Sequence, residues 1–189
     1  MDDLRLPLAL TLAALTLGPA PARSRPADWP PPFDVQVRRD DVRLQATRTM
    51  TLDLPGPANA VFAMFGPLGE KIWSPGWNPT FITPSPDAQT PDGAVFTTGG
   101  PDDVAVWVMT DFDPVQRIVR YVHVRPGKIA AQLWISVDAV SERRSRADVT
   151  FRYTRLGPAG DVAMQHFLDN FPHYKEHWEQ FIGQALRGK

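Results

Sequence analysis

A stripe of large apolar side chains near the C-terminus most constrains how this chain can fold. At 100° per residue the stripe fills about a 100° sector of a helical wheel, which is typical of an amphipathic helix. Its members are Phe167, Phe171, Tyr174, Trp178, Phe181, Ile182 and Ala185. Pro172 interrupts the run, so we expect a first helical segment from about Asp161 and a main helix from about Pro172 to Leu186. The apolar face must be buried against an element of comparable size.

The segments before this stripe alternate between apolar and polar residues, as β-strands with one buried face do. Residues 42–54 alternate in this way, and β-forming runs follow at 80–83, 94–98, 104–112, 117–125, 129–140 and 147–155. Turn sequences such as Asp113-Pro114 separate these runs about every ten residues, which favours an antiparallel meander over βαβ units. The inner face of such a sheet is the only partner large enough for the C-terminal stripe. In two strands, 104–112 and 117–125, odd- and even-numbered positions are both apolar, so the pattern does not show which face points inward.

The stretch from Ala58 to Ile82 joins the first strand to the rest of the sheet. It begins as a short apolar helix, is interrupted at Gly66-Pro67, and leaves room for at most two more helical turns before Pro75. Trp73 and Trp77 flank the Pro-Gly turn at its end and form a large, rigid apolar surface. Such a surface suits either the entrance of a pocket or a plug for the core.

This order of elements resembles the helix-grip fold of the START-like or SRPBCC superfamily, which includes Bet v 1-like proteins, polyketide cyclases and Hsp90-activator-like domains. The stretch V-F-A-M-F-G-P-L-G-E-K-I-W-S-P-G-W is similar to the start of many bacterial SRPBCC domains. The resemblance covers roughly Asp41 to Lys189. It implies an α+β fold with a curved antiparallel sheet of about six or seven strands, a long C-terminal helix, and two short helices after the first strand. It also implies an apolar cavity between sheet and helix, and it supplies no catalytic residue.

The N-terminal residues predict export and a linker. Residues 1–22 have the parts of a secretory signal peptide: the apolar run Leu6–Leu17, the breaker Gly18-Pro19 and the small-residue site Ala20-Pro21-Ala22. The acidic Asp2-Asp3 start does not fit the usual basic one, so a cytoplasmic location stays the alternative to a periplasmic or secreted one. We expect a proline-rich linker or arm at 23–40, the START-like domain at 41–189, and no integral membrane segment in the mature chain.

Composition and motifs exclude several classes of function. A formal net charge of −1 gives no electrostatic footprint for nucleic acid, and the absence of cysteine excludes disulfides, thiolate metal sites and cysteine nucleophiles. The segment His173-Tyr174-Lys175-Glu176-His177 matches the H-x-x-E-H pattern of zinc peptidases. Glu179 is the only acidic residue after it and lies too close to complete such a site, so we expect no metal and no cofactor.

Ten residues are the candidates for ligand binding: Arg48, Trp73, Trp77, Trp107, Tyr121, His123, Tyr153, His173, His177 and Trp178. Arg48 is the one charged residue on the apolar face of the first strand. Three interpretations stay open: it forms an ion pair within the fold, it lies at the rim of the inner face, or it binds an anionic ligand. His173 and His177 lie at the border of the helical stripe, either as a half-exposed polar flank or as part of the cavity wall. The aromatic residues are either plain core or cavity wall.

The sequence therefore predicts a protein that binds a small, largely apolar molecule of lipid, polyketide or aromatic type, without catalysis. The first alternative is a cyclase or dehydratase in which His173, His177, His123 or Arg48 polarises a bound carbonyl group. The second alternative is a protein-interaction module similar to the co-chaperone relatives. No catalytic residue is assigned, and the ligand and oligomeric state stay open.

Overall fold

The computed structural model describes residues 44–83 and 93–188, so the predicted signal peptide (1–22) and arm (23–40) lie outside the described residues. In these ranges the strands are β1 (Gln45–Pro55), β2 (Thr80–Phe81), β3 (Val95–Thr98), β4 (Ala105–Asp113), β5 (Ile118–Arg125), β6 (Ile129–Ser141) and β7 (Arg144–Arg155). The helices are α1 (Ala58–Ala63), α2 (Pro67–Trp73) and α3 (Gly160–Arg187). Among the described residues, no helix combines the length and hydrophobicity needed to cross a membrane.

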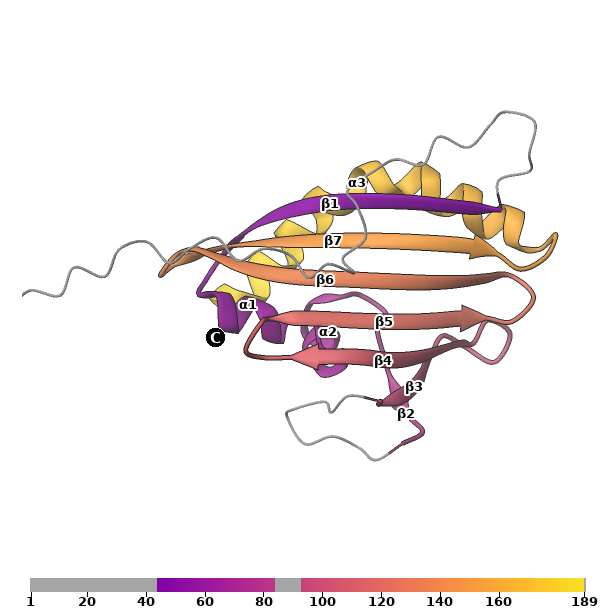
Figure 1. The fold of residues 1–189 in the computed structure, drawn as a ribbon, viewed down its shortest axis with the longest axis horizontal. Helices are drawn as coiled ribbons and strands as arrows, with labels where there is room; N and C mark the ends of the chain where they lie inside the picture. Colours follow the sequence, from indigo (N-terminus) through magenta and orange to yellow (C-terminus); the bar gives the residue numbers. More distant parts are fainter. Residues whose placement is uncertain (1–43, 84–92, 189) are drawn as a thin grey trace, which may run out of the picture.

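The strands form one antiparallel sheet in the order β1-β7-β6-β5-β4-β3-β2 (Figure 1). β1 is the only strand displaced from chain order, because it pairs with the last strand, β7. Register shifts between Met109 and Asp111 and between Ala139 and Ser141 interrupt the ladders, as β-bulges do where a sheet curves. The predicted α+β helix-grip fold is confirmed.

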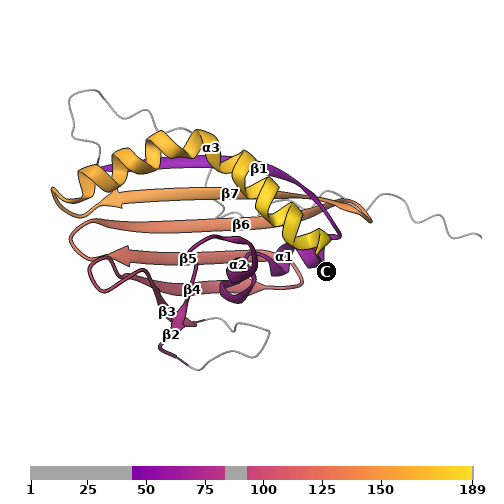
Figure 2. The same cartoon turned by 180° about the vertical axis from the view of Figure 1, so that it is seen from behind.

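The helices all lie on one face of this sheet. Figure 2 shows α3 over β1 and β7, and α1 and α2 over the strands on the other side of the same face. Polar contacts fasten α3 to the sheet edge: Lys175 Nζ donates to the Thr51 carbonyl oxygen at 2.6 Å, and the Asp53 amide donates to the Glu179 carboxylate at 2.7 Å. The apolar stripe of α3 is thereby held against the inner face of the sheet.

The C-terminal helix differs from its predicted form. We expected two segments divided near Pro172, whereas α3 is one continuous helix of 28 residues that contains Pro172. A proline in a helix removes one backbone hydrogen bond and usually kinks the helix without ending it when tertiary contacts hold both sides. The helix does change direction near its middle, running first along β1 and then slanting across the sheet toward α1 (Figure 2).

The space between α3 and the short helices is filled with aromatic side chains. Trp73 is only 6% exposed, its indole N–H donates to the Met64 carbonyl oxygen at 2.7 Å, and its ring lies 5.0 Å from that of Trp178. Trp77 donates to the Pro67 carbonyl oxygen at 2.8 Å and packs edge-on against Trp107 at 5.0 Å. Of the two alternatives left open for Trp73, pocket entrance or plug for the core, the structure shows the second: α2 inserts it into the core.

The start of α3 lies very close to the β5–β6 turn, and this closeness requires a glycine. A Cβ atom on Gly160 would lie 2.1 Å from the Lys128 carbonyl oxygen and 2.7 Å from Cγ of Arg155. Glycine-to-alanine substitutions in helices normally stabilise by up to about 1 kcal/mol. Here we expect Gly160→Ala to lower the free energy of unfolding by about 1–3 kcal/mol in urea titrations, because the helix must move away from the turn.

A matched substitution separates this clash from general effects of alanine. Gly100 has an ordinary φ, and nothing lies within 4 Å of a Cβ built on it. Gly100→Ala should therefore leave the free energy of unfolding within about 0.5 kcal/mol of the parent value. A Gly160→Ala variant as stable as the parent would contradict the close packing of α3 on the turn.

Candidate functional site

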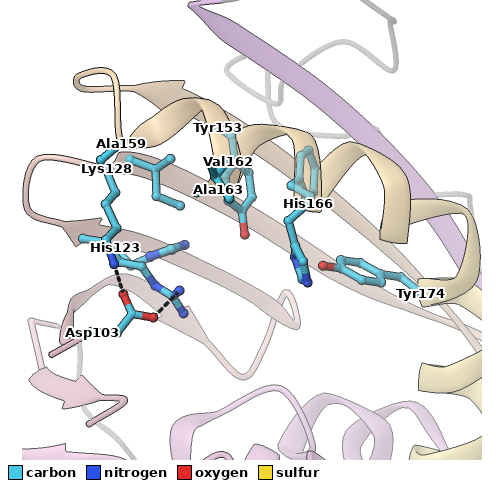
Figure 3. Close-up of a pocket in the computed structure, with 12 residues that line it drawn as sticks. Asp103, His123, Lys128, Tyr153, Ala159, Val162, Ala163, His166 and Tyr174 are labelled. Carbon is cyan, nitrogen blue, oxygen red and sulfur yellow. Dashed lines mark hydrogen bonds and ion pairs between the residues drawn. The ribbon is translucent and has the colours of Figure 1, made fainter. Parts of the chain in front are cut away.

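A pocket of about 460 Å³ lies between the first half of α3 and the inner face of the sheet (Figure 3). The sheet and its loops contribute Asp103, His123, Arg125, Lys128, Ile129 and Tyr153. The helix and the residue before it contribute Ala159, Val162, Ala163, His166, Phe167 and Tyr174. The predicted cavity between sheet and C-terminal helix is therefore present, at the end of the sheet where β5 turns into β6.

One wall of the pocket is a continuous aromatic surface. Tyr153 of β7 and Phe167 of α3 stack with ring centroids 4.0 Å apart and planes 15° apart. His123 of β5 stacks on Trp107 of β4 at 4.1 Å and meets Tyr153 edge-on at 5.8 Å. Rings held by neighbouring strands and by the helix lose little conformational freedom when a flat ligand packs on them.

The polar groups of this wall are uncharged at neutral pH. Burial lowers the pKa of His123 to about 3, with a smaller contribution from the Arg125 charge. Burial also raises the pKa of the Tyr153 and Tyr174 phenols, against the opposing effect of Arg125. Figure 3 shows both phenol oxygens turned into the pocket. The wall thus presents a neutral imidazole and two hydroxyl groups among apolar surface.

Three side chains of opposite charge meet at the outer end of the pocket. Asp103 accepts a hydrogen bond from Lys128 Nζ at 2.9 Å and one from Arg125 Nη1 at 3.0 Å (Figure 3, dashed lines). The hydrogen bond from Lys128 is the main cause that lowers the pKa of Asp103. All three side chains are more than a third exposed, so these ion pairs add little stability. They separate the main pocket from a smaller one of about 220 Å³.

Of the ten candidate residues, the structure places His123 and Tyr153 in the wall of this pocket. Trp107 lies behind His123, and its indole N–H donates to Thr98 Oγ1 at 2.9 Å. Tyr121 is 1% exposed, and its hydroxyl donates to the Phe65 carbonyl oxygen at 2.8 Å, which ties the α1–α2 connection to β5. Trp73, Trp77 and Trp178 belong to the aromatic core described above and do not line the pocket.

The remaining three candidates lie away from the pocket. Arg48 is half-buried on β1, and its Nη1 donates to the Thr47 carbonyl oxygen at 2.9 Å. His173 and His177 are exposed on α3 with their rings 6.3 Å apart, as the polar-flank interpretation expects. In residues 44–83 and 93–188, no group of three His, Cys, Asp or Glu side chains is placed to hold a metal ion.

The sequence analysis missed most of the charged and helical lining residues. The sequence did contain a sign that Arg125 lies near the pocket. Arg125 is on the same face of β5 as His123 and directly precedes the turn at Pro126-Gly127. Tyr174 had one as well, as a member of the helical stripe. Asp103 had none, since a β3–β4 loop residue is brought beside Arg125 only by the antiparallel pairing of β4 with β5.

Comparisons with known proteins indicate the fold alone. No family model matches the sequence, and a comparison with curated proteins found no match. The Zhui aromatase/cyclase from a Streptomyces species superposes with a TM-score of 0.54 and 14% identity over 76% of this chain and 94% of that one. Norcoclaurine synthase from Thalictrum flavum, solved with dopamine and hydroxybenzaldehyde, superposes with a TM-score of 0.55 and 11% identity over 76% of this chain and 87% of that one. CalU16 from Micromonospora echinospora superposes with a TM-score of 0.55 and 13% identity over 76% of each chain. The chain therefore has a helix-grip fold of the SRPBCC or Bet v 1-like type, as these solved structures do.

Proposed function

We propose that the protein binds a small, largely apolar molecule in the pocket between α3 and the sheet. The observation that carries this proposal is the aromatic wall formed by His123, Tyr153 and Phe167, with Trp107 stacked behind His123. The volume of about 460 Å³ lies within the range of about 300–1,000 Å³ typical of small-molecule sites. The flat wall favours an aromatic ligand over an extended acyl chain, because stacked rings offer a plane of matching shape.

Blocking the pocket with a bulky side chain tests the proposal. Ala163 lines the pocket on α3, so Ala163→Phe should weaken binding of 2-naphthol at least about 10-fold by calorimetric titration. Native mass spectrometry of the purified protein, before and after incubation with a lipid extract, extends the test to ligands of other shapes. Ala63→Phe makes the same substitution at an exposed helical position outside the pocket and should leave affinity unchanged.

The proposal predicts saturable binding of one ligand per chain in the parent protein. Absence of any bound or bindable apolar molecule in both experiments would overturn it. Equal affinity of the Ala163→Phe variant and the parent would place the ligand elsewhere and would also overturn it.

A cyclase or dehydratase is the second candidate, and the convergence of His123 and Tyr153 on one wall favours it. The Tyr153 phenol stays protonated and can donate a hydrogen bond to a ligand carbonyl. The His123 imidazole, with its pKa lowered to about 3, is a poor proton acceptor near neutral pH. We therefore rank binding above catalysis.

A further inference from the structure

On the pocket side of β5, Nδ1 of His123 and Nε of Arg125 are buried and have no hydrogen-bond partner among the described residues. His123 is 3% exposed, and both residues line the pocket from the same face of the strand, two positions apart. Buried N–H groups without a partner are rare in folded proteins, because each has lost its bond to water and gained none. The two atoms together indicate that a ligand supplies the missing hydrogen-bond acceptor.

The charges around this end of the pocket favour a negative ligand group. Arg125 and Lys128 share the single carboxylate of Asp103. The neighbouring pair at the start of α3, Arg155 with Asp161, adds one charge of each sign. Among the arginine, lysine and carboxylate side chains that line the main pocket itself, the cations exceed the carboxylates by one. The N-terminal end of α3 also lines the pocket, and its dipole adds positive potential.

We propose that the ligand is an aromatic anion, such as an aryl carboxylate, whose charged oxygens accept hydrogen bonds from Arg125 Nε and His123 Nδ1. Its ring lies on the stacked pair Tyr153 and Phe167. The stack on Trp107 fixes the plane of the His123 imidazole, and an anionic oxygen selects the neutral tautomer with its proton on Nδ1. This inference rests on the proposed function and adds the chemical class of the ligand.

A pair of probes that differ only in charge tests the inference on the full chain. 2-Naphthoate and 2-naphthamide have the same ring and nearly the same shape, and their dissociation constants are measured by calorimetry at pH 7.5. We expect naphthoate to bind about 10-fold more tightly, a moderate factor because Arg125 is 37% exposed. We expect this preference to shrink with added salt.

Two variants and one matched control assign the preference to these atoms. Arg125→Gln and, independently, His123→Phe should each weaken naphthoate binding more than naphthamide binding, and so reduce the naphthoate preference. Arg120→Gln removes the same charge from the same strand, but its side chain lies on the opposite face, paired with Asp111 at 3.5 Å. It should keep the full preference.

The outcomes separate this inference from the proposed function. Equal affinity of the parent protein for both probes overturns the anionic class and leaves the apolar pocket standing. An unchanged preference in both Arg125→Gln and His123→Phe overturns the assigned atoms. Failure of both probes to bind the parent protein overturns the proposed function and this inference with it.

Discussion

Replacing Phe151 with alanine should lower the free energy of unfolding by about 3–5 kcal/mol, the usual cost of deleting a buried aromatic ring. Phe151 is 4% exposed on β7, at the centre of the contact between sheet and helix. Its ring contacts five others, at centroid distances of 5.9–6.3 Å: Tyr153, Phe167, Phe171, Tyr174 and Trp178. Four of the five are on α3, so the substitution removes the side chain that most directly holds the helix to the sheet.

Urea titrations followed by circular dichroism measure this loss. Ile72→Ala is the control, because it truncates to alanine an apolar side chain that is 55% exposed, and it should change stability by less than about 0.5 kcal/mol. Phe167 and Tyr174 also line the pocket, so Phe151→Ala should weaken 2-naphthol binding as well. A loss below about 1 kcal/mol would show that the core closes over the missing ring.

The fold could be predicted because its local and global signals agree. Gly66-Pro67 separates α1 from α2, and turn residues separate strands of nearly the predicted lengths. The one failure was Pro172, which was expected to divide the C-terminal helix. Local propensity disfavours proline inside a helix, but the burial of the apolar stripe on both sides of it outweighs that cost and keeps α3 continuous.

The site could be predicted only in part, because residue type does not distinguish core from pocket wall. On β4 and β5 both faces carry valine or aromatic residues, and only the coordinates show that Trp107, Tyr121 and His123 face inward. Trp73 and Tyr153 are both aromatic, yet α2 packs the first into the core, whereas the second lines the pocket. That difference depends on backbone positions, which alternation along one strand does not encode.

The pH dependence of stability should report the burial of His123. Its pKa is about 3 in the folded protein, against the ordinary 6.5 of an exposed histidine. Below pH 6.5 the unfolded chain therefore binds a proton that the folded protein does not, so stability falls as pH decreases toward 3. At about 1.4 kcal/mol per pH unit, this group alone should cost about 3 kcal/mol between pH 6.5 and pH 4.

Glu70 acts in the opposite direction and must be separated from His123. The Glu70 side chain on α2 is 7% exposed, and burial raises its pKa well above the ordinary value. Above pH 4.5 the unfolded chain loses a proton that folded Glu70 retains, so its contribution to stability decreases as pH rises. The stability of the Glu70→Gln variant should therefore rise more steeply between pH 4.5 and pH 6.5 than that of the parent.

The comparison of the parent with His123→Phe isolates the histidine, since all other ionisable groups are common to both proteins. Phenylalanine keeps the stack on Trp107 and removes the group that binds the proton. The stability of the variant relative to the parent should increase by about 3 kcal/mol as pH falls from 6.5 to 4, measured by urea titration at each pH. The contrary outcome is a difference in the free energy of unfolding between His123→Phe and the parent that stays constant with pH. It would mean that His123 takes up its proton in the folded protein as readily as in water. The neutral imidazole assigned to the pocket wall would then be wrong.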